Sequence, residues 1–99
     1  MINQNAIVTM CDRALDYINR RSEIVERFGY KYFVRAISDM LLAMGNYSNI
    51  EVVPGNCNNT SDFQELQNRF DSFMSKLGVT CNSNRVSDKI KAIKDFCEF

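Results

Sequence analysis

Apolar residues recur along this chain at the spacing of amphipathic helices. The clearest case begins at Ser61, a helix-capping residue with Gln64 three residues later, the spacing of a capping box. The apolar residues that follow alternate in steps of three and four, which places them on one helical face: Phe63, Leu66, Phe70, Phe73 and Leu77. Gly78 comes directly after the last of them, where helices commonly end. The pattern predicts a helix over residues 61–77.

Three further segments have the same periodicity, and we predict helices near residues 5–28, 30–44 and 85–97. The apolar stripe of the first consists of Ile7, Cys11, Ala14, Ile18 and Val25, with Met10 and Phe28 beside it. This stripe has one fault, because Arg21 and Ser22 stand where an apolar pair is expected. Two interpretations of Arg21 are open: its stem lies along the edge of the core with the charged head in water, or it contacts a partner.

These segments predict an all-α fold, a small four-helix domain that takes in residues 1–99. We expect Gly29 and Gly45 to end the first two helices. A long irregular loop is expected over residues 45–60, which contain the only proline and several asparagines. The aromatic stripe of the third helix is expected to pack on the first two helices.

Charge and composition narrow the classes of function. The 99 residues include 12 Lys or Arg and 12 Asp or Glu, so the net charge is zero. A neutral chain lacks the field that draws proteins to nucleic acid or to an anionic membrane, and we expect neither as a partner. No signal-peptide pattern is visible, and no apolar run approaches the roughly 18 residues of a membrane span. We therefore predict a cytoplasmic protein.

No residue pattern indicates catalysis. The chain has no histidine, which removes the usual general base near neutral pH and the commonest partner of a cysteine nucleophile. Glycine-rich phosphate loops, hydrolase motifs and closely spaced metal ligands are absent from the sequence. We predict that the protein is not an enzyme and uses neither a cofactor nor a metal ion.

The four cysteines divide by position. Cys11 and Cys97 fall on apolar stripes, so we predict that both are small buried side chains. Cys57 and Cys81 lie in predicted loops, where they could oxidise or pair. Their reactivity depends on exposure and neighbours, which the sequence leaves open.

Aromatic and basic residues alternate between positions 27 and 35. They could form a corner of the core with Phe28, Tyr30 and Phe33 inward, a protein interface rich in Tyr and Arg, or a surface that stacks on nucleic acid. The following helix also has more apolar surface than one packed face needs, so its other side is a candidate contact surface. The residues of this candidate interface are Arg27, Lys31, Tyr32, Arg35 and Asp39.

The run from Lys76 to Thr80, with predicted helices on both sides, resembles the helix-turn-helix of DNA-binding proteins. The resemblance implies that the last helix presents basic residues to DNA, namely Arg85, Lys89, Lys91 and Lys94. A plain helix–loop–helix is the other interpretation, because the spacing from Gly78 to Val86 is too long for the compact turn.

Elimination leaves binding as the expected function. We expect a non-enzymatic protein that docks on a larger protein or complex and modulates or inhibits it, alone or as a homodimer. Accessory regulators and phage-type inhibitors have this profile. The alternatives are a small helix-turn-helix-like DNA-binding regulator and a structural subunit of a larger assembly.

Overall fold

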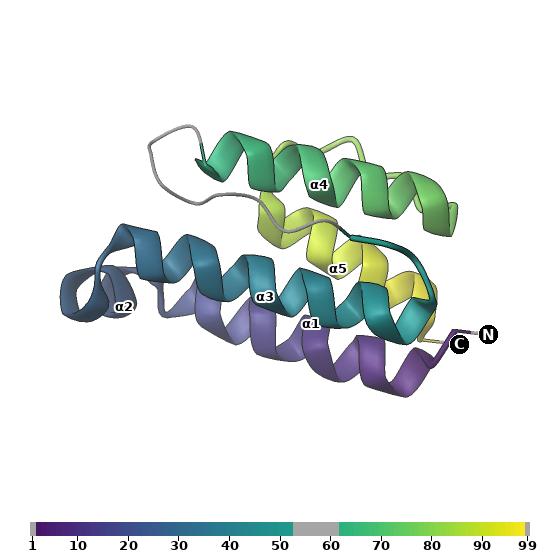
Figure 1. Ribbon diagram of the computed structural model, residues 1–99, viewed down its shortest axis with the longest axis horizontal. Coiled ribbons are helices and arrows are strands. Elements are labelled where there is room, and N and C mark those ends of the chain that lie inside the picture. The colour runs from purple at the N-terminus through teal and green to yellow at the C-terminus, as the bar shows by residue number, and fades with distance from the viewer. Residues whose placement is uncertain (1, 53–61, 99) are drawn as a thin grey trace.

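The computed structural model describes residues 2–52 and 62–98 of the chain (Figure 1). These residues form α1 (Gln4–Asn19), α2 (Arg21–Phe28), α3 (Tyr30–Ser48), α4 (Asp62–Leu77) and α5 (Val86–Cys97). The predicted all-α class is confirmed. The predicted number of helices is wrong by one, because the expected helix over 5–28 is two helices.

The break between α1 and α2 falls at Arg20, next to the fault in the apolar stripe. Arg20 leaves helical geometry with φ −100° and ψ 18°, and its side chain forms ion pairs of 3.5 Å with both Asp16 and Glu23. Beyond this residue the chain changes direction, and α2 buries Ile24 against the core. A continuous helix would have directed Arg21 and Ser22 inward instead, so the break resolves the fault.

The end of α3 also differs from the prediction. Gly45 does not end the helix, which continues to Ser48 and stops at Asn49 in the left-handed conformation with φ 59°. Asparagine tolerates this conformation and can replace glycine as a helix terminator. Gly45 is buried, and a Cβ built on it would clash with the side chain of Val52 and lie 2.9 Å from the carbonyl oxygen of Ile50. A glycine at position 45 is therefore needed for the close packing of Ile50 and Val52 against α3.

The last two helices are close to their predicted bounds. The capping residue Ser61, and residues 53–60 of the loop expected over 45–60, lie outside the described residues. The end of α4 is as predicted, since Gly78 follows Leu77 with φ 84°. The start of α5 is one residue later than predicted, at Val86.

The four long helices lie along a common axis, and α1 alone of them runs against the others (Figure 1). Two contacts show that α1 and α5 are antiparallel. Asp12, near the middle of α1, pairs at 2.7 Å with Lys94 in the last turn of α5. Ile18, at the end of α1, lines the same cavity as Val86, the first residue of α5. In contrast, α3, α4 and α5 are parallel, and all three begin at the end of the molecule where α2 lies (Figure 1).

The connection between α4 and α5 must therefore return along the molecule. Residues 78–85 contain no helix. Eight extended residues span about 26 Å, close to the roughly 24 Å length expected for a 16-residue helix such as α4. This connection is not the compact turn of a helix-turn-helix, and the two helices it joins are parallel.

One hydrophobic core joins all five helices. Its largest fully buried side chains include Phe33 of α3 and Phe70 and Phe73 of α4. The predicted aromatic stripe of α4 is thus buried, but α4 packs on α3 and α5 and has no close backbone approach to α1. None of the described helices has the length and apolar character needed to cross a membrane.

Candidate functional site

Three aromatic side chains from three different helices meet at the surface. Phe28 and Tyr32 are 57% and 46% exposed, and their ring centroids are 5.0 Å apart with the planes tilted by 35°. The hydroxyl of Tyr17 donates a hydrogen bond of 3.3 Å to the hydroxyl of Tyr32. This hydrogen bond, with a smaller effect of desolvation, raises the pKa of the Tyr17 phenol. We call these three residues the aromatic face.

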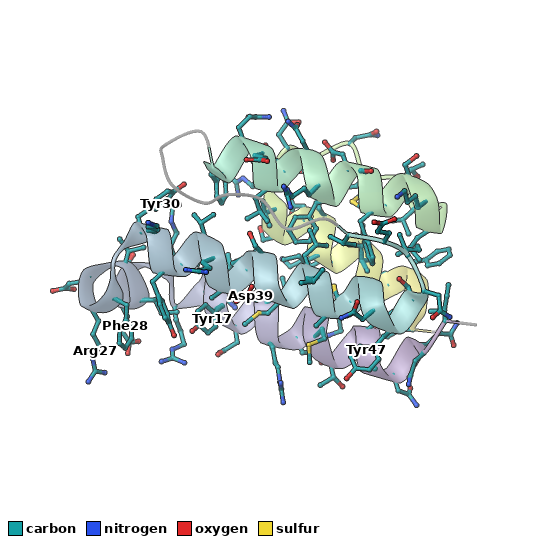
Figure 2. The ribbon with its side chains drawn as sticks, in the orientation of Figure 1. Tyr17, Arg27, Phe28, Tyr30, Asp39 and Tyr47 are labelled. Atoms are coloured by element: carbon teal, nitrogen blue, oxygen red, sulfur yellow. The ribbon has the colours of Figure 1, made fainter. Side chains whose placement is uncertain are left out.

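The aromatic face forms where α2 turns into α3. Phe28 is the last residue of α2, and Gly29 follows with φ 96°, a conformation that favours glycine. The reversal places Phe28 beside Tyr32, while Figure 2 shows Phe28 and Tyr17 on the same side of the molecule. The alternative of a core corner with Phe28 inward is wrong for Phe28, because α2 directs Ile24 into the core instead. The expectation for Phe33 is confirmed, since it is buried.

Basic side chains border the aromatic face. The guanidinium of Arg27 lies 5.7 Å from the centroid of the Phe28 ring, and Figure 2 shows both residues at the α2 end. Lys31 and Arg35 are exposed on α3, and Asp39 is exposed one turn beyond Arg35. All five residues of the predicted interface, Arg27, Lys31, Tyr32, Arg35 and Asp39, are therefore accessible.

Arg21 lies at the edge of the core. The residue is exposed, and its guanidinium is 5.9 Å from the ring centroid of Tyr30, 5.8 Å from that of Phe33 and 6.0 Å from that of Phe63. Such contacts are favourable cation–π interactions. The charged head is thus held against aromatic rings, a contact that joins the α2 end to the first turn of α4.

A cavity of about 270 Å³ opens beside Arg21, and we call it the bundle-end cavity. Residues of all five helices and of the connection before α5 line it. Its apolar wall consists of Ile18, Phe33, Ile37, Phe63 and Val86. Its cationic residues are Arg21 and Arg85, and its other polar residues are neutral. The cavity was not predictable from the sequence, because no local pattern shows that five separate helices contribute to one site.

Two of the cysteines in the described part of the chain, Cys11 and Cys97, are not suited to nucleophilic chemistry. Cys11 and Cys97 are buried, as predicted. Burial, the largest cause, raises the pKa of the Cys11 thiol to about 12, and burial also raises the pKa of Cys97. Nucleophilic attack needs the thiolate, which these surroundings disfavour. Cys81 is half-buried, and Cys57 lies outside the described residues.

The basic residues of α5 are only partly available to an external ligand. Lys89 is buried and forms a 2.8 Å ion pair with Asp71 of α4. Lys94 pairs with Asp12 at 2.7 Å and with Glu98 at 3.8 Å. Two of the four basic residues that the helix-turn-helix resemblance assigns to DNA thus have internal partners. Among residues 2–52 and 62–98, no group of three or more acidic or cysteine side chains could hold a metal ion.

Comparison of the chain with protein-family models, with curated proteins and with solved structures finds no match.

Proposed function

We propose that this chain is a non-enzymatic protein-binding domain that docks on a larger protein through the aromatic face and modulates that protein. The observation that carries the proposal is the exposure of Phe28 and Tyr32, whose tilted rings contact each other at the surface instead of entering the core. Exposed rings in contact offer apolar area that a partner can desolvate. Tyrosine and arginine are also enriched among the residues that dominate binding energy.

The charges beside the aromatic face indicate the chemistry of the partner surface. Arg20 already pairs with both Asp16 and Glu23. Arg27 and Arg35 form no ion pair within residues 2–52 and 62–98, and the same is true of Lys31. A complementary surface would present apolar groups to the rings and carboxylates to these three bases. The proposed partner is therefore a protein with an acidic rim around an apolar patch.

Such a contact would modulate the partner by occupying part of its surface. A domain of this size covers part of a partner's surface and excludes other molecules from it, which requires no chemistry of its own. We place this activity in the cytoplasm, and the same face could also join two copies of the chain. Self-association of the chain and docking on a partner are separate outcomes, and light scattering measures the first of them.

The double variant Phe28→Ala, Tyr32→Ala tests the proposal. We expect proteins captured from a native lysate by the wild type to be lost with this variant, and the affinity for a purified captured protein to fall at least about tenfold, since each ring is a candidate hot spot. The variant should keep its helical circular dichroism, because both side chains are exposed. Light scattering of the wild type measures self-association independently.

Tyr47→Ala is the matched control. Tyr47 is 44% exposed and lies on the same helix as Tyr32, but at the opposite end (Figure 2). Capture should be unaffected by this change. Equal capture by the wild type and the double variant would show that the aromatic face is not the docking surface.

A further inference from the structure

We propose that the bundle-end cavity binds a small organic carboxylate with a compact apolar body. The apolar body would occupy the cavity, and the carboxylate would meet the guanidinium groups of Arg21 and Arg85. This site is separate from the aromatic face, so the inference goes beyond the proposed protein-binding function.

The size and wall of the cavity fit one ring or a short branched chain. Its volume is about 270 Å³, somewhat below the roughly 300–1,000 Å³ of pockets for drug-sized ligands and above the roughly 150 Å³ that holds a single benzene. The wall combines aliphatic side chains such as Ile37 with the rings of Phe33 and Phe63. Apolar walls with a few polar groups at one side are the usual composition of a small-molecule site.

The charged residues of the cavity favour an anion. Neither Arg21 nor Arg85 has an ion-pair partner among the described residues, and no acidic side chain of that part of the chain lines the cavity. Guanidinium groups bind carboxylates through two parallel hydrogen bonds. A ligand carboxylate would therefore supply the partner that the described part of the chain does not.

Helix ends add to this preference. Three helices begin at this end of the molecule, and the first two residues of α5, Val86 and Ser87, line the cavity (Figure 1). Arg85 at the N-cap of α5 provides no side-chain cap. Asp88 follows in the first turn, but its carboxylate accepts a 2.6 Å hydrogen bond from the hydroxyl of Ser83. Amide groups at helix starts carry partial positive charge, which favours a bound anion.

Arg21 is positioned before any ligand arrives. Its guanidinium lies within 6.0 Å of three ring centroids, and Phe33, one of those rings, is buried. A side chain that is already held loses little conformational entropy when it binds a ligand. This contact explains why the arginine stands at the position where the apolar stripe of the sequence is interrupted.

A titration with phenylacetate, followed by amide chemical shifts of the full chain, tests the inference. We expect saturable shifts at Val86 and Ser87, and the neutral isostere phenylacetamide should bind at least about tenfold more weakly, because it cannot form a charge-assisted pair. Arg85→Gln should weaken phenylacetate binding by a similar factor. The spectrum of the ligand-free variant shows directly whether its fold is intact.

Arg13→Gln removes one exposed arginine from α1, outside the cavity, and should leave the affinity unchanged. Equal affinities for phenylacetate and phenylacetamide would overturn the inference, and so would an unchanged affinity in Arg85→Gln. The absence of shifts at the start of α5 up to about 10 mM ligand, where even a weak site is substantially occupied, would also overturn it.

Discussion

Cys11 shows how one buried side chain makes the stability of the whole protein depend on pH. Its thiol is fully buried and donates a weak hydrogen bond of 3.7 Å to the sulfur of Met44. The pKa of this thiol is about 12 in the folded protein, against 9.0 for an unperturbed cysteine. The unfolded chain therefore loses its proton at lower pH than the folded chain does.

We predict that the contribution of the Cys11 thiol to the free energy of unfolding is intact below pH 9.0 and is lost as the pH rises toward 12. The loss should approach about 1.4 kcal/mol per pH unit within that interval. Urea midpoints at pH 8 and pH 10 measure it. Cys11→Ala lowers stability at both pH values, because it leaves a small void. The variant should nevertheless lose less stability between pH 8 and pH 10 than the wild type does. Identical losses in the two proteins would contradict the assignment.

The candidate interface was predictable only in part at the scale of single residues. Lys31, Tyr32, Arg35 and Asp39 of the candidate interface are exposed in the structure, and their role as an interface stays a prediction. The position of Phe28 was not predictable, because it depends on how α2 is rotated after the break at Arg20. The change of helix direction at the single residue Arg20 is decided by tertiary packing. Periodicity within one helix contains no information about such a change.

At the scale of elements, Gly45 fixes the approach of the segment after α3 to that helix. A Cβ at this position would clash with the Val52 side chain and lie 2.9 Å from the carbonyl oxygen of Ile50. Ala is otherwise the better helix former, by about 1 kcal/mol. We predict that the clash dominates, so that Gly45→Ala lowers the free energy of unfolding by about 1–3 kcal/mol, as overpacking usually does.

Denaturant unfolding measures this loss, and Val52→Ala in the same chain should restore part of it by removing the nearer obstacle. Gly78→Ala is a useful comparison, since nothing lies within 4 Å of its Cβ position and only its φ of 84° opposes the change. A Gly45→Ala protein more stable than wild type would mean that Val52 does not pack there.

The end of α3 was misplaced by the sequence for a physical reason. Apolar spacing located α3, α4 and α5 and placed α1 and α2 within a single helix, because all five bury apolar residues in the common core. The termination of α3 was misplaced because Gly45 is also suited to close packing, whereas Asn49 supplied the left-handed residue. Both residue types can end a helix, and only the packed structure shows which of them does.

At the scale of the whole molecule, the direction of the helices could not be read from the sequence. Short connections favour antiparallel neighbours, but residues 78–85 are long enough to return along α4 and make α5 parallel to it (Figure 1). This arrangement gathers three helix starts at the α2 end. The bundle-end cavity exists only because of it, since Phe63 and Val86 each stand at the start of a helix.

The antiparallel pairing of α1 with α5 determines how the protein should respond to mechanical load. Gln4 and Glu98 line one surface hollow, so a pull between them would separate the two helices from one end. Contacts would then break in succession, beginning near Cys97 and continuing past the Asp12–Lys94 ion pair. A pull between Gln4 and Arg85 acts along the helices instead and must break these contacts together. We predict a lower unfolding force for the first geometry in optical-tweezers measurements at equal loading rate. Equal forces would show that α1 and α5 do not part first.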